Sequence, residues 1–194
     1  MASDKEKVAT HEAGHALAIL MSPFREEIVH VGVYCRNGNW FGYTVVFGDR
    51  GKLDPTGVFE FTKGLAGPLT QLHFYPKSVP ADLSKIIEGS GSLLNAARHV
   101  IKHELAISTN WWDDLIDWNQ YCLRCLRDGA RIRGDGFLAV EKELNRFLKN
   151  TAVESVVKEL VERLVKENCV ERDELLAIPV DKLPKFHFPE NFPE

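Results

Sequence analysis

Residues 11–15 read His-Glu-Ala-Gly-His, and this segment constrains the chain more than any other because it implies a helix and a chemistry together. The surrounding residues, from Lys5 to Met21, are rich in Ala, Leu, Glu and Lys and predict a helix. Residues four apart on a helix lie on one face, so His11 and His15 can hold one metal ion. Glu12 projects about 100° further round, where its carboxylate can reach a water beside the metal. The pattern therefore predicts a hydrolytic zinc site with Glu12 as its general base.

The apolar run after the motif, Ala16 to Ile19, predicts that this helix is buried beside the site. A buried pair of histidines needs partners, and a metal ion would supply one. The alternative is a helix whose two histidines form only ordinary hydrogen bonds. The motif is short, but its residue types and their spacing are specific, and they favour the metal site.

The composition is that of one globular domain. A length of 194 residues and a hydrophobic fraction of 44% allow a sizeable core. We expect residues 1–178 to form this domain and residues 179–194 to form a Pro-rich tail. The formal charge of -4 argues against a nucleic-acid partner. No apolar run is long enough for a membrane span and no signal peptide is evident, so we expect a cytoplasmic protein.

The cysteines do not form the dense pattern of a small disulfide-rich domain, and we expect reduced thiols. Cys122 and Cys125 have the C-x-x-C spacing of a second zinc site or a redox pair. Both also fall at helical spacing with Trp111 and Trp118, which favours their role as small apolar side chains in a helix face.

The pattern of elements predicts an α+β fold that is mainly helical. Ile28 to Tyr34 and Trp40 to Phe47 have strand composition, and the turn residues 37–39 between them predict a β-hairpin next to the motif helix. Phe59 to Tyr75 predicts a helix, although Pro68 lies inside it. Further along the chain we expect a polar loop at residues 49–55, a short helical turn from Pro80 to the Gly-Ser stretch 89–91, helices at 92–108, 111–127, 138–150 and 153–168, a loop at 129–136, and an extended tail from Pro179.

Several blocks of the chain, in order, resemble the zinc peptidase domain of the FtsH family of membrane-anchored AAA+ proteases. The motif helix resembles that family's zinc helix, and the predicted hairpin contains a similar Gly-Tyr-Thr stretch at residues 42–44. A Leu-Ala-Gly core at residues 65–67 and helices similar to the later part of that domain follow. The likeness covers roughly residues 5–108 and 137–178, and it leaves segment 109–136 as an insertion.

A catalytic zinc ion usually has three protein ligands and one open position, so the histidine pair needs a third ligand. In the FtsH family this ligand is an aspartate after the Leu-Ala-Gly helix, and the resemblance assigns the role to Asp82. A helix N-cap is the alternative role for Asp82. His73 and Glu88 are rival ligands. Residues 70–72 are Thr, Gln and Leu where the family usually has acidic residues.

The resemblance implies a zinc metalloendopeptidase that hydrolyses unfolded or flexible polypeptides. Relatives work in ATP-driven rings, whereas this chain has no G-x-x-x-x-G-K-[ST] loop, so a homo-oligomer or a separate ATPase is a candidate partner. The strand from Phe41 to Phe47 could pair with an extended substrate, or it could be a core or dimer-edge strand. The rival hypothesis is a catalytically silent zinc-binding interaction or scaffold protein. For the Trp-rich segment 109–136, a partner surface, a lid and ordinary core packing are the alternatives.

Overall fold

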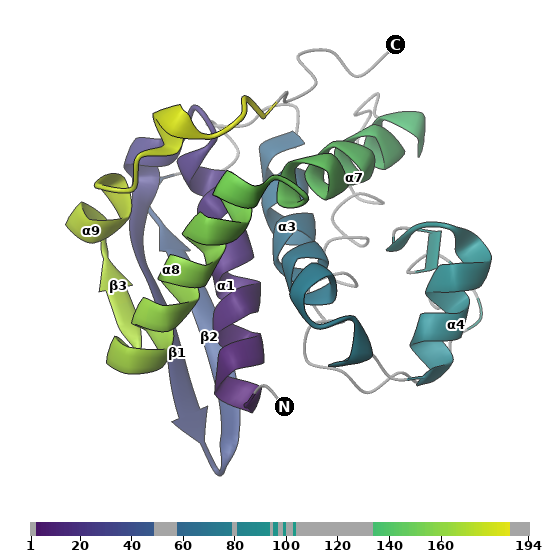
Figure 1. Ribbon diagram of the computed structural model, residues 1–194, viewed down its shortest axis with the longest axis horizontal. Coiled ribbons are helices and arrows are strands. Elements are labelled where there is room, and N and C mark those ends of the chain that lie inside the picture. Colours follow the sequence, from purple (N-terminus) through teal and green to yellow (C-terminus); the bar gives the residue numbers. More distant parts are fainter. Residues whose placement is uncertain are drawn as a thin grey trace.

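The computed structural model describes residues 3–48, 58–78, 81–93, 95–96, 99, 103 and 134–186; the side chains at 58–61, 78, 81–83 and 134–137 lie outside this description. Helix α1 (Asp4–Leu20) lies at the centre of the molecule. A three-stranded antiparallel sheet lies on one side of α1, and α3 (Val58–Phe74) lies on the other (Figure 1). The fold is α+β and mostly helical, as the sequence predicts.

Helix α1 begins with a capping box. The Ser3 hydroxyl accepts a hydrogen bond from the Glu6 backbone N–H, and the Glu6 carboxylate accepts one from the Ser3 backbone N–H. The helix is buried from Ala9 to Gly14 and again from Ala16 to Leu20. It ends before Pro23, which cannot continue a helix. The predicted helix is confirmed, and its burial on nearly every side makes it the element around which the others pack.

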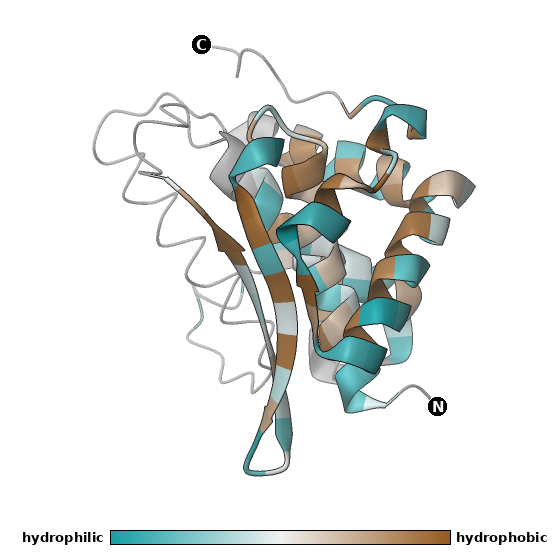
Figure 2. Ribbon diagram, turned by 90° about the vertical axis from the view of Figure 1, so that its left-hand side faces the viewer, coloured by the Kyte–Doolittle hydropathy of each residue, from teal (hydrophilic) through white to brown (hydrophobic). Residues whose placement is uncertain are grey.

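The sheet contains the predicted hairpin and one strand that was not predicted. Strands β1 (Ile28–Arg36) and β2 (Asn39–Val46) are joined at Asn37 and Gly38, whose φ angles of 52° and 81° are those of a tight hairpin turn. This exposed turn forms the hydrophilic tip of the hairpin (Figure 2). The third strand, β3 (Cys169–Glu171), pairs with the other side of β1. It has three residues, too few for alternation to indicate a strand in the sequence.

Helix α3 continues through Pro68. A proline in a helix interior removes one backbone hydrogen bond and costs about 3 kcal/mol. The burial of Leu65, Ala66 and Leu69 against the rest of the core offsets that cost. The contact with α1 is close because Gly14 has no side chain: a Cβ there would lie 2.6 Å from the Ala66 carbonyl oxygen.

The later helices are α4 (Ala81–Ser90), α7 (Gly134–Leu148), α8 (Thr151–Glu167) and α9 (Arg172–Leu176), with short 3-10 helices η1 (Arg25–Glu27), η2 (Pro76–Ser78) and η3 (Val180–Lys182). Asn150 caps the start of α8 and Asn168, with a φ of 66°, ends it. The charged outer surface of α8 is visible beside its buried apolar face in Figure 2.

Three expectations need correction. The loop expected at residues 129–136 is wrong over 134–136, because α7 already begins at Gly134. Glycines in the sequence suggested a break there, but a helix end tolerates them better than a helix interior. The helical turn expected after Pro80 is a helix of 10 residues, α4. The tail expected to be extended from Pro179 contains η3.

Other expectations lie outside the described residues. These are the loop at 49–55, the helix at 111–127 with Cys122 and Cys125, and most of the insertion 109–136 and of the helix expected up to Ser108. The start of that last helix is described: the Ser92 hydroxyl accepts from the Asn95 backbone N–H, as a cap should. The buried Glu141 carboxylate of α7 accepts from the Leu93 backbone N–H, 2.7 Å away.

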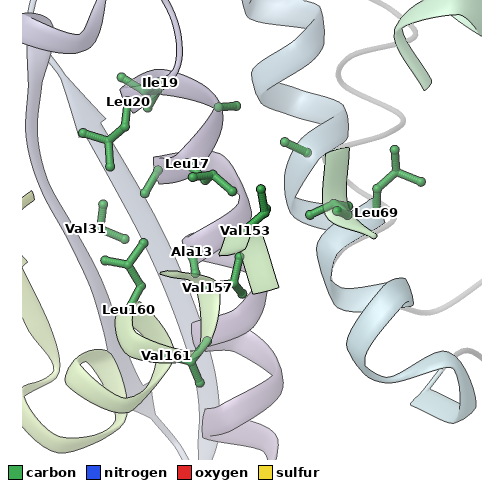
Figure 3. Packing of buried hydrophobic residues seen from close by; sticks show 14 of the residues in the cluster. Ala13, Leu17, Ile19, Leu20, Val31, Leu69, Val153, Val157, Leu160 and Val161 are labelled. Carbon is green, nitrogen blue, oxygen red and sulfur yellow. The ribbon is translucent and has the colours of Figure 1, made fainter. Parts of the chain in front are cut away.

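The core surrounds α1. Side chains of α8 lie beside Ala13 and Leu17 of α1, and Leu20 lies near Val31 of β1 (Figure 3). Leu69 brings α3 into the same cluster (Figure 3). The motif helix is therefore held by the sheet, by α3 and by α8 at once. None of the helices within the described residues combines the length and the apolar character that crossing a bilayer requires.

Candidate metal centre

His11 and His15 lie one turn apart on α1, and their rings approach each other edge to face with centroids 4.7 Å apart. Among the described residues, His11, Glu12 and His15 form a group whose candidate ligand atoms all lie within 4.8 Å of one another. His11 and Glu12 are buried, with 5% and 7% of their surface exposed. The structure thus brings together the three residues that the motif singled out.

Helix α3 orients both imidazole rings. Nδ1 of His15 lies 2.7 Å from the backbone carbonyl oxygen of Lys63, and Nδ1 of His11 lies 3.2 Å from Oε1 of Gln71. A carbonyl oxygen only accepts hydrogen bonds, so each Nδ1 carries the proton and the lone pair of each ring lies on Nε2. This is the arrangement that a metal-binding histidine needs.

The two Nε2 atoms converge beside Gly67 of α3. A Cβ built on Gly67 would lie 2.5 Å from Nε2 of His15 and 2.7 Å from Nε2 of His11. Both rings therefore pack against the bare Cα of Gly67, with their Nε2 atoms turned to the same point. The donor set, whose candidate ligand atoms lie within 4.8 Å of one another, fits a zinc ion held by His11 and His15.

Glu12 faces strand β2. Its Oε2 accepts a hydrogen bond of 2.7 Å from the Thr44 hydroxyl, and a Cβ on Gly42 would lie only 2.4 Å from its Oε1. Gly42 and Thr44 are two apart on the strand and therefore lie on the same face, towards α1. The glycine permits the close approach and the threonine fixes the carboxylate. The arrangement holds one carboxylate oxygen in place and leaves the other beside the strand.

The structure does not bring the rival third ligands to the histidines. His73 is bound to Glu154 of α8, with Nε2 and Oε1 3.0 Å apart. Glu88 is exposed and accepts from the Ser84 hydroxyl on its own helix. Neither belongs to the His11, Glu12 and His15 group. Asp82 lies in α4, which Figure 1 draws beyond α3 from α1, and its side chain is outside the described residues, so its assignment stays a prediction.

Sequence reasoning missed the groups that orient the site. Gln71, Thr44 and the Lys63 carbonyl contact the three motif side chains, but none belongs to the motif. The Leu-Ala-Gly and Gly-Tyr-Thr stretches were a signal that these segments are special. What each residue contacts could not be derived from them, because the contacts depend on how α3 and β2 pack on α1.

The face of the sheet away from α1 carries a thiol of low acidity. Burial raises the pKa of Cys169, and a hydrogen bond to Glu171 raises it further. Burial, followed by the nearby Cys169, also raises the pKa of Tyr43. A protonated thiol is a poorer nucleophile and a poorer metal ligand than a thiolate.

No protein-family model matches the chain, and no curated protein matches it.

Proposed function

We propose that this chain is a zinc-dependent metalloendopeptidase that hydrolyses peptide bonds of unfolded or flexible polypeptides. The observation that carries the proposal is the position of Glu12 beside two histidines whose Nε2 atoms converge on one space. A protein that only binds a metal has no need of a carboxylate held by Thr44 next to that space. We further propose that the fold is of the FtsH peptidase type and that Asp82 is the third ligand.

Zinc, when bound, supplies Lewis-acid polarisation of a peptide carbonyl and makes a neighbouring water more acidic. His11 and His15 would hold the ion through Nε2. Glu12 acts as the general base: it accepts the proton of the attacking water and then delivers it to the amine that leaves. The Thr44 hydroxyl keeps Oε2 fixed during both transfers. The products are two shorter peptides.

Strand β2 is the proposed place where the polypeptide binds. In the sheet that the structure describes, β2 has β1 as its single neighbour, so its other edge is available for main-chain pairing. Because Gly42 and Thr44 contact Glu12, a peptide along this edge would pass next to the general base. Pairing through the main chain reads the backbone rather than the side chains, which suits flexible segments of varied sequence. A homo-oligomer or a separate ATPase that delivers such segments is a candidate partner.

The test combines metal content with hydrolysis. Purified protein is analysed for zinc, and cleavage of an unfolded protein is compared between wild type and Glu12→Gln, with Glu162→Gln, an exposed residue of α8, as the matched control. We expect zinc in all three proteins, cleavage by wild type and Glu162→Gln, and a loss of at least about 100-fold in Glu12→Gln, the lower end of the range for general-base catalysis. Zinc binding with no cleavage that depends on Glu12 would support the silent scaffold instead. Absence of zinc after reconstitution would reject both functions.

A further inference from the structure

We propose that Gln71 is the positioning residue that fixes His11 as a metal ligand, an inference that rests on the metal site of the proposed function. Gln71 is buried, with 9% of its surface exposed, and lies on α3 facing α1. Its Oε1 is 3.2 Å from Nδ1 of His11. The amide thus selects the ring tautomer in which Nε2 carries no proton.

The two histidines differ in how firmly they are oriented. His15 is held by a backbone carbonyl, which can only accept and which no substitution at Lys63 removes. His11 is held by a side-chain amide, which carries a donor as well as an acceptor. If the amide were turned round, its NH₂ group would donate to Nδ1, the proton would move to Nε2, and the ligand atom would be blocked. The orientation of Gln71 is therefore a condition for metal binding.

The amide also sets the strength of the site. A carboxylate in this position would accept the same hydrogen bond and add a negative charge, which makes the imidazole a stronger ligand. Gln71 gives the direction of the hydrogen bond without the charge. We infer that the chain holds its metal less tightly than a carboxylate-backed version of the same site would, so Gln71→Glu retains or increases zinc affinity while Gln71→Leu lowers it.

The experiment measures zinc affinity by competition with a chromophoric chelator for wild type, Gln71→Leu, Gln71→Glu and the control Thr70→Val. Thr70 is buried next to Gln71, but its hydroxyl bonds the Ala66 carbonyl and not a histidine. We expect Gln71→Leu to lose about 10- to 100-fold in affinity, the usual cost of removing such a partner. Thr70→Val should bind zinc with nearly the affinity of wild type. Gln71→Glu should bind zinc with the affinity of wild type or a higher one.

A second readout is independent of metal and of activity. In apoprotein with ¹⁵N-labelled histidine, the imidazole nitrogen shifts should place the His11 proton on Nδ1 in wild type and Gln71→Glu, and on both nitrogens in exchange in Gln71→Leu. The proposal is overturned if Gln71→Leu is folded and keeps wild-type zinc affinity, or if Thr70→Val or Gln71→Glu loses as much affinity as Gln71→Leu. Peptidase activity enters neither measurement, so a failure of the proposed hydrolysis and a failure of this role for Gln71 are seen separately.

Discussion

Gly42 determines whether Glu12 can take its position, because a methyl group there would lie 2.3 Å from Cγ and 2.4 Å from Oε1 of Glu12. We expect Gly42→Ala to push the carboxylate away from the Thr44 hydroxyl while the metal ligands stay in place. A displacement of about 1 Å of a catalytic group can reduce turnover about 100-fold. Cleavage of an unfolded protein by Gly42→Ala should fall by this order, with zinc content unchanged.

The matched control for this change is Gly89→Ala in α4, where, among the described residues, nothing but its chain neighbours and the backbone of its own helix lies within 4 Å of the added methyl group. Wild-type rates for Gly42→Ala would show that the position of Glu12 seen here does not matter for hydrolysis. If Gly42→Ala also loses zinc, strand β2 supports the metal-binding histidines rather than Glu12.

Cys169 offers a test of the electrostatics on the other face of the sheet. Its pKa is raised by burial and then by Glu171, so less thiolate is present at pH 8 than in an unfolded chain. Iodoacetamide should therefore modify the exposed Cys35 before Cys169, as mass spectrometry of the two peptides would measure. Glu171→Gln removes the charge and should speed the reaction of Cys169, whereas Glu162→Gln should not. Equal rates for Cys169 in folded and denatured protein would contradict the raised pKa.

The sequence could predict His11, Glu12 and His15 because helix geometry alone puts residues four apart on one face. It could not predict that Gln71, on a helix 60 residues away along the chain, contacts His11. That contact depends on how α3 is rotated about its own axis and on its position along α1. Both follow from the close packing at Gly14 and Gly67. The spacing of residues in a local motif can be read from the sequence. The groups that orient the side chains of that motif depend on tertiary packing and cannot.

The packing of α3 on α1 is itself open to a test at Gly14. A Cβ on Gly14 would lie 2.5 Å from the Thr70 hydroxyl and 2.6 Å from the Ala66 carbonyl, and a backbone carbonyl in a helix cannot move aside alone. We expect Gly14→Ala to lower the free energy of unfolding by about 1–3 kcal/mol, the usual cost of overpacking, even though alanine favours a helix more than glycine does. Denaturant unfolding of Gly14→Ala and of Gly89→Ala would measure it. An increase in stability for Gly14→Ala similar to that of the control would show that the helices are not in such close contact.

Long elements were predictable and short ones were not. Helices α1, α3 and α8 have 17 residues each, enough for their composition and apolar pattern to indicate a helix. Strand β3 and helix α9 have three and five residues; β3 is stabilised by pairing with β1, and α9 packs against β1 and β3. Pro68 also shows that tertiary burial can keep a helix continuous where local preference would break it.

The candidate site lies on the helix around which the sheet, α3 and α8 pack. Helix α1 contacts β1, β2, α3 and α8, and the groups around the histidines come from two of these elements, α3 and β2. An ion held at this place binds the assembled molecule much better than an unfolded chain, in which the orienting groups are dispersed. Metal binding should therefore stabilise the whole fold and not only the site.

We expect zinc to raise the Tm of the apoprotein and a chelator to reverse the rise. A ligand at about a hundred times its Kd adds about 2.7 kcal/mol, which for a chain of this length corresponds to a Tm shift on the order of 5–10 °C. Gly67→Ala would put a methyl group 2.5 Å from Nε2 of His15 and 2.7 Å from Nε2 of His11, which must displace the rings, so its Tm should not respond to zinc. Gly89→Ala should respond as wild type does. A full response of Gly67→Ala would place the ion elsewhere, because rings displaced by this methyl group no longer present their two Nε2 atoms to one ion.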